Sequence, residues 1–170
     1  VLTYPTGTIL LEQGDVPYQC YFVLKGCIRQ FGIDEDGREV TYEFYTEEQT
    51  VALFGQFSED KPSKYSWTCV EECVLVVGDL SEQQSMFDSH DGLESMTRKM
   101  MDVNMGEMQE MKSVLISDSP EERYQKLMTN RPDLLTRVPQ HQLASYLGIT
   151  PESLSRIKRR IDKSKFKIAE

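Results

Sequence analysis

Short runs of β-branched and aromatic residues, separated by turn-forming residues, dominate residues 7–80. The runs occupy residues 9–11, 21–24, 28–31, 40–45 and 74–77. The dipeptide Asp36-Gly37 between two of these runs predicts a β-hairpin, since both residue types tolerate the positive φ angles of a tight turn. Regular short strands with Gly and Asp turns predict an antiparallel sandwich or barrel.

The character of the chain changes after Leu80, where a long helix is expected. Residues 81–116 contain no proline, and six of the eight methionines lie between residues 96 and 111. Apolar residues recur there at helical spacing and form a wide stripe. We expect this stripe to pack against its copy in a second subunit; the alternative is that it lies on the β domain of its own chain. The candidate dimer-interface residues are Met96, Met100, Met101, Val103, Met105, Met108, Met111 and Leu115.

A further helix is predicted to begin after Ser119, where a capping serine precedes Pro120 and two glutamates. This helix should end before Pro132, because proline cannot continue a helix.

Two short helices joined by a tight turn are predicted over residues 139–161. Gly148 should follow the end of the first helix, because the left-handed conformation of a C-terminal cap costs glycine least. Thr150 should cap the second helix, with Pro151 at its first position. The small side chain of Ala144 lets the two helices cross closely. The inward-facing apolar residues are Leu143, Leu147, Leu154, Ile157 and Ile161. The combination indicates a helix-turn-helix that binds duplex DNA.

The outward face of the second helix carries residue types that contact nucleic acids. Arginine donates bidentately to O6 and N7 of guanine, and glutamate accepts from the cytosine amino group. The candidate DNA-binding residues are Gln140, Thr150, Glu152, Ser153, Ser155, Arg156, Arg159 and Arg160, and the lysines that suit phosphates are Lys158, Lys163, Lys165 and Lys167. The alternative is an ordinary amphipathic helix pair with a solvated basic face.

The distribution of charge favours DNA binding although the net charge of the chain is −9. Residues 1–80 contain 5 basic and 14 acidic residues, whereas residues 136–170 contain 8 basic and 3 acidic residues. A basic tail on an acidic body is expected where one end of a protein meets phosphate.

Few residues suit catalysis or metal binding. The four cysteines, at positions 20, 27, 69 and 73, form no C-x-x-C motif and are expected to be reduced thiols; a redox or iron–sulfur sensor is the alternative. His90 and His141 stand in unrelated segments, and no Ser/His/Asp set, P-loop or zinc spacing is present. We therefore expect neither an enzyme nor a metal site.

The sequence contains no apolar run long enough for a membrane helix and no signal-peptide pattern. We expect a cytoplasmic protein that does not enter a membrane. The start at Val1 is interpreted as a trimmed N-terminus.

The whole chain resembles the Crp/Fnr family of bacterial regulators. In the β domain the resemblance rests on residues 7–15, 21–26 and 36–39, and in the tail on Ala144, Gly148, Glu152 and Arg156. It implies an α+β fold: an antiparallel β-roll of the cyclic-nucleotide-binding type (a double-stranded β-helix), a long dimerisation helix and a C-terminal, winged-helix-like helix-turn-helix whose wing is short or absent. The expected boundaries are residues 1–80 for the β-roll, 81–117 for the helical connector and dimerisation helix, and 118–170 for the DNA-binding domain.

The resemblance also implies how bases are read. Glu152 and Arg156 match the base-reading glutamate and arginine of the family, whereas Pro151 stands where the cyclic-AMP receptor has a further base-reading arginine. The operator should therefore differ from that of the cyclic-AMP receptor.

The expected effector pocket departs from the family pattern. Cyclic-nucleotide binders of the family carry a Gly-Glu pair for the ribose and an arginine followed by Ser or Thr for the phosphate. The corresponding residues here are Gly55, Gln56, Phe57, Ser63 and Lys64. Lysine cannot reproduce the bidentate fork of arginine, so we expect cyclic AMP binding to be weak or absent. The pocket should take another small molecule or be a structural remnant.

These features together predict a transcription regulator whose partners are double-stranded DNA, a second copy of the chain, RNA polymerase and an unidentified small-molecule effector. The alternative is an effector-sensing module that acts mainly through protein contacts, with little DNA binding.

Overall fold

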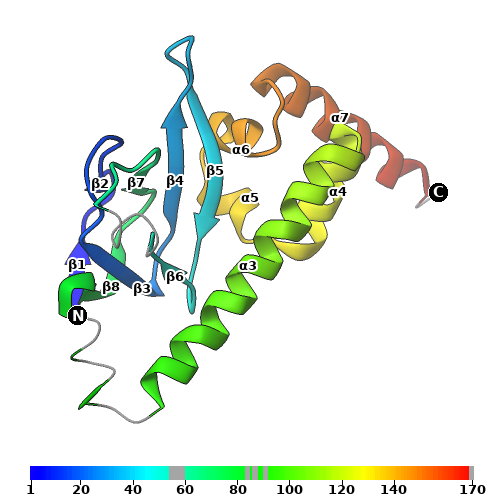
Figure 1. The fold of residues 1–170 in the computed structure, drawn as a ribbon. Helices are drawn as coiled ribbons and strands as arrows, with labels where there is room; N and C mark the ends of the chain where they lie inside the picture. The colour runs from blue at the N-terminus through cyan, green and yellow to red at the C-terminus, as the bar shows by residue number, and fades with distance from the viewer. Residues whose placement is uncertain (54–59, 83–84, 86–87, 90–91, 169–170) are drawn as a thin grey trace. The chain divides into compact units, whose positions relative to one another are not determined.

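The structure is a computed structural model that describes residues 1–53, 60–82, 85, 88–89 and 92–168 (Figure 1). The side chains of residues 93, 100, 101, 104, 107, 108, 110–112, 115 and 164–168 lie outside this description. The chain divides into two compact units, residues 1–109 and 110–170. The expected functional division after residues 80 and 117 stays a prediction.

The first unit contains two four-stranded sheets in which every described strand pair is antiparallel. The strand order in one sheet is β1 (Leu2–Tyr4), β8 (Cys73–Asp79), β3 (Gln19–Lys25) and β6 (Thr50–Val51). The order in the other is β2 (Ile9–Leu11), β7 (Ser66–Cys69), β4 (Ile28–Ile33) and β5 (Glu39–Tyr45). The predicted antiparallel architecture is therefore confirmed, and β1, β6 and β7 add to the strands expected from the sequence.

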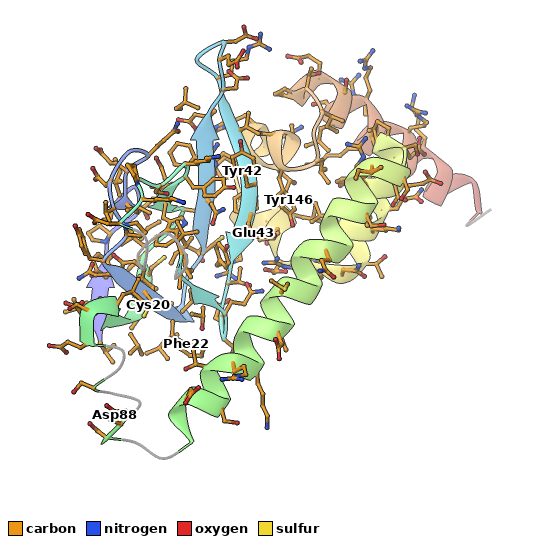
Figure 2. All side chains as sticks on the ribbon, viewed as in Figure 1. Cys20, Phe22, Tyr42, Glu43, Asp88 and Tyr146 are labelled. Atoms are coloured by element: carbon orange, nitrogen blue, oxygen red, sulfur yellow. The ribbon has the colours of Figure 1, made fainter. Side chains whose placement is uncertain are left out.

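The core of this unit lies between the two sheets. Val23 and Leu75 of one sheet and Ile28 and Trp67 of the other are at most 1% exposed. Burial of each such large side chain stabilises the fold by about 1.5–3 kcal/mol. Side chains alternate along a strand, so neighbours such as Phe22 point away from this core, and Figure 2 shows Phe22 on β3.

The hairpin between β4 and β5 forms where Asp36-Gly37 predicts it. Gly37 has a φ of +77°, and its N–H donates to Asp34 O at 3.0 Å. The Asp34 carboxylate accepts from the backbone N–H groups of Asp36 and Arg38 at 3.0 and 2.8 Å. The turn is thus stabilised by its own side chain, as is common for aspartate.

A second turn, between β3 and β4, depends on Gly26. Its φ is +109°, and a Cβ at this position would lie 2.6 Å from Cys73 Sγ and 2.8 Å from Glu72 O. Only glycine fits the turn without displacing β8.

Helices make up the rest of the described chain. They are the 3-10 helix η1 (Leu80–Glu82), α3 (Leu93–Ser117), α4 (Pro120–Asn130), α5 (Leu134–Arg137), α6 (Gln140–Tyr146) and α7 (Pro151–Ile168). Ser119 caps α4 as predicted, and it forms a capping box with Glu122. Helix α7 continues past the predicted end at Ile161, because neither glycine nor proline follows to end it. Among the described residues of 110–168 there is no strand and hence no hairpin wing.

Candidate nucleic-acid interface and effector region

Helices α6 and α7 pack through the apolar residues that the sequence analysis places on their inner faces. Ala144 is fully buried, as is Leu154, and Leu143 is 1% exposed. Ile157 and Ile161 on the next turns of α7 are also buried. The absence of a larger side chain at position 144 lets the two helices approach closely, so the opposite face of α7 remains in solvent.

The turn between the two helices has the predicted capping geometry. Gly148 has a φ of +67°, and the Ile149 N–H donates to Ala144 O at 3.0 Å. Thr150 Oγ1 accepts from the backbone N–H of Ser153 at 3.2 Å, and α7 begins at Pro151. Satisfying these terminal groups fixes the direction in which α7 leaves the turn.

Arg123 of α4 connects this turn to the end of α3. Its Nη1 donates to Leu147 O at 2.6 Å, and its Nε donates to Asp118 O at 3.1 Å. Leu147 is the last residue before Gly148, and Asp118 directly follows α3. Because carbonyl groups at a helix C-terminus carry partial negative charge, one guanidinium stabilises two helix ends together. Lys126 adds an ion pair to Asp118 at 2.7 Å.

The N-terminal turns of α7 present the candidate base-reading side chains to solvent. Glu152, Arg156 and Arg159 are exposed. The pKa of Glu152 is lowered, first by a hydrogen bond from its own backbone N–H, then by the Thr150 hydroxyl and by the nearby Arg156 charge. Glu152 therefore stays an anionic acceptor at neutral pH. Arg156 Nη2 donates to Ser153 Oγ at 3.1 Å, which orients the guanidinium along this face.

Two other candidates have partners within the helical unit. Gln140 Nε2 donates to Ser155 Oγ at 2.9 Å and so ties the start of α6 to α7. Arg160 forms an ion pair with Glu121 of α4 at 2.9 Å. Arg160 thus lies at the border of the exposed face, where it helps to hold α7 on α4. The side chains of Lys165 and Lys167 lie outside the described residues.

The expected effector residues are only partly described. Gly55, Gln56 and Phe57 lie outside the described residues. Ser63 is buried, and its hydroxyl donates to Tyr65 O at 2.8 Å and accepts from Tyr65 N–H at 3.0 Å. Lys64 is exposed. The Ser63 hydroxyl is therefore engaged in its own turn.

The predicted dimer stripe is exposed where its side chains are described. Met96, Val103 and Met105 of α3 are 55%, 61% and 63% exposed. The side chains of the other five candidates lie outside the described residues. They are Met100, Met101, Met108, Met111 and Leu115.

The cysteines are reduced, as predicted. All four are free; Cys27, Cys69 and Cys73 are buried and Cys20 is half-buried. Burial raises the pKa of the Cys20 thiol, so it is a poor nucleophile. In the part of the chain that the structure describes, no three His, Cys, Asp or Glu side chains are grouped to hold a metal ion.

A family model decides the class of the β unit: the model of the cyclic nucleotide-binding domain matches residues 1–90. The chain belongs to the cyclic nucleotide-binding domain family. This cyclic nucleotide-binding domain is the antiparallel, two-sheet unit described above, and its match extends to the connector before α3.

Solved structures with the same fold are transcription regulators at low sequence identity. FixK2 from Bradyrhizobium japonicum has a TM-score of 0.81 at 14% identity, over 96% of this chain and 84% of that one. The c-di-GMP responsive global regulator CLP of Xanthomonas campestris has a TM-score of 0.76 at 18% identity, over 96% and 86%. A CRP-family regulator from Thermus thermophilus has a TM-score of 0.75 at 14% identity, over 97% and 86%.

No curated protein sequence matches the chain significantly. Among the described residues, no helix has the length and apolar character that a membrane crossing requires. The fold of the cyclic nucleotide-binding domain and its structural matches therefore point to a regulator rather than to an enzyme.

Sequence reasoning missed two polar residues that organise these regions, Arg123 and Gln30. Arg123 is an isolated arginine on an amphipathic helix, and its acceptors lie 5 and 24 residues away. Gln30 stands within a predicted strand, and only its alternation with Ile28 on β4 indicates that it faces the core.

Proposed function

We propose that the chain is a transcription regulator that binds duplex DNA as a homodimer, with α6 and α7 forming a helix-turn-helix. The observation that carries the proposal is the exposed face of α7, where Glu152, Arg156 and Arg159 project from a helix whose opposite face is buried. The structural similarity to CRP-family regulators supports it.

In this proposal α7 enters the major groove with its N-terminal turns. Arg156 donates to O6 and N7 of a guanine, and Glu152 accepts from a cytosine amino group. Lys158 and Lys163 bind phosphates together with Arg159, so they contribute affinity without reading sequence. The candidate contacts Gln140, Thr150, Ser153 and Ser155 position this face or donate to the backbone near the start of α7, and Arg160 acts through its pairing with Glu121.

The dimer forms through α3. Met96 and Val103 are one heptad apart and expose apolar surface, as expected for a seam that a second copy of the helix covers. A symmetric dimer presents its two α7 helices to successive major grooves, so the half-sites lie about 34 Å apart. The wider stripe proposed for this seam includes Met105 and the five candidates whose side chains are not described.

An unidentified small molecule in the β-roll controls DNA binding, and RNA polymerase is the expected protein partner at the promoter. Such a regulator works in the cytoplasm, with residues 1–80 sensing, 81–117 dimerising and 118–170 binding DNA. Cyclic AMP is not the expected effector, since Lys64 is the only basic residue between residues 62 and 97.

Selection from a library of random DNA duplexes tests the proposal. The full chain should enrich a two-fold-symmetric site, and its affinity for that site should fall steeply with salt because phosphate contacts release counterions. Arg98→Ala is a matched control for Arg156→Ala, because it removes the same charge from an exposed ion pair on α3. Failure to enrich any symmetric site would favour the alternative, a sensor that acts through protein contacts.

A further inference from the structure

A buried side-chain amide lies in the core of the β-roll. Gln30 on β4 is 6% exposed and stands opposite Trp67 of β7 in the strand register. It shares its face of β4 with Ile28, a member of the hydrophobic core between the two sheets. A glutamine in such a place must satisfy one acceptor and two N–H donors away from bulk water.

Two hydrogen bonds fix the orientation of the Gln30 amide. Trp67 Nε1 donates to Gln30 Oε1 at 3.1 Å, and Tyr45 Oη donates to the same oxygen at 3.0 Å. An indole N–H can only donate, so the amide oxygen and not the nitrogen must face Trp67. Burial raises the pKa of the Tyr45 phenol well above its usual range, so this hydroxyl keeps its proton and remains a donor.

The amide nitrogen is left with two N–H groups to place. Among the described residues, the Gln30 side chain makes only the two hydrogen bonds to its oxygen, and neither involves Nε2. Buried N–H donors of this kind are nearly always paired, because leaving them unpaired costs much of their hydration. Tyr21 and Trp67, whose rings meet edge to face at 6.1 Å, provide aromatic surface in the same core.

The charges around this core do not suit an anion. Arg29 follows the opposite face of β4, where its guanidinium donates to Glu39 at 2.6 Å and to Thr41 at 2.8 Å. Lys64 is exposed, and the segment 54–59 contains no basic residue in its sequence. The acidic composition of residues 1–80 further opposes the approach of a phosphate.

We propose that the β-roll of this chain binds an uncharged, planar small molecule whose carbonyl oxygen or ring nitrogen accepts a hydrogen bond from Gln30 Nε2. Aromatic side chains of the core contact the rings of the ligand, and the Trp67 and Tyr45 hydrogen bonds hold the amide in the orientation that presents its donor. As an effector this ligand rests on the proposed DNA-binding function, but its binding does not.

The tryptophan beside Gln30 gives a direct assay, because Trp67 is the only tryptophan of the chain. The full chain, without DNA, is titrated with benzamide and with 2-quinolone, two neutral planar compounds that carry a carbonyl acceptor. Benzoate and cyclic AMP are the anionic comparison compounds. At least one neutral probe should change Trp67 fluorescence saturably, and neither anion should do so.

Three variants separate the donor from other causes. Gln30→Glu keeps an acceptor for Trp67 and Tyr45 but loses the N–H donors, and Gln30→Met removes the whole amide at similar size. Both should weaken the neutral probe by roughly 10-fold or more. Lys64→Met should leave its affinity unchanged, since Lys64 is exposed. Far-UV circular dichroism checks that each variant is folded.

Three results would overturn the proposal. The first is no response to either neutral probe up to its solubility limit, which would mean that water alone satisfies the amide. The second is equal binding by wild type and a folded Gln30→Glu variant. The third is tight binding of cyclic AMP that Lys64→Met abolishes. Because the titration contains no DNA, each result is independent of the operator selection.

Discussion

Replacing Arg123 by methionine should destabilise the helical unit selectively. The change removes two charge-assisted hydrogen bonds, to Leu147 O at 2.6 Å and to Asp118 O at 3.1 Å, while keeping an unbranched side chain. Hydrogen bonds to charged groups contribute about 1.5–3 kcal/mol each, and Arg123 is only half-buried, so we expect a loss of about 3 kcal/mol in the free energy of unfolding.

Urea unfolding measured with two probes checks this prediction. Circular dichroism at 222 nm reports mainly on the helices, whereas the fluorescence of Trp67 reports on the β unit. With a urea dependence of about 1.5 kcal/mol per molar, the helical transition should move by roughly 2 M. The fluorescence transition should stay in place. Arg123→Lys, which can reach one carbonyl but not both, should give an intermediate shift.

Arg98→Met is the matched control for this variant. Arg98 forms an exposed i,i+4 ion pair with Glu94, so its loss should cost less than about 0.5 kcal/mol. An unchanged helical transition in Arg123→Met would refute the reasoning. So would an equal shift of both probes, because the effect would then not be confined to the unit that contains Arg123.

Three further changes test local parts of the account. Gly26→Ala should destabilise the β unit by at least about 2 kcal/mol, because φ is +109° and the new Cβ meets Cys73, and a thermal melt followed by Trp67 fluorescence would show it. Thr150→Ala should cost about 1 kcal/mol of helical-unit stability in urea, since it removes the cap of α7; an unchanged midpoint would contradict the cap. Hydrogen bonds from Ser119 lower the pKa of Glu122, so its stabilising contribution is present above the pKa of the unfolded state and lost as the pH falls through the lower folded value. Acid unfolding should therefore be less pH-dependent in Glu122→Gln, and an identical profile would exclude this carboxylate as a cause.

Local chemistry explains why much of the fold could be predicted. Caps and turns depend on a few adjacent residues, so Ser119, Gly148 and Thr150 identify helix ends, and Asp36-Gly37 identifies a hairpin. The strands of strong β propensity were equally evident. These elements also predicted which face of α7 is buried, since apolar residues recur there at helical spacing.

The features that sequence reasoning missed depend on contacts between distant segments. Strand β7 consists of Ser66, Trp67, Thr68 and Cys69, which is not an apolar run, yet it pairs with both β2 and β4. β6 has two residues and forms only through its pairing with β3. Such strands take their conformation from neighbours rather than from propensity. The same holds for Arg123, whose second acceptor lies 24 residues away.

The candidate site shows a similar limit. The exposure of Glu152 and Arg156 follows from helical periodicity, but the Glu121 partner of Arg160 does not. The orientation of the Gln30 amide depends on donors from two neighbouring strands, 15 and 37 residues away. Polar networks of this kind become visible only when the tertiary structure brings their members together.

The most direct measurement for the central claim is the affinity of Arg156→Ala for every single-base variant of the selected DNA site. If α7 reads bases, the variant should lose about 1–3 kcal/mol on the selected site and lose discrimination at one symmetry-related position in each half-site. Lys163→Ala should instead weaken all sequences alike and reduce the salt dependence. Undiminished discrimination at every position by a folded Arg156→Ala protein would contradict the account.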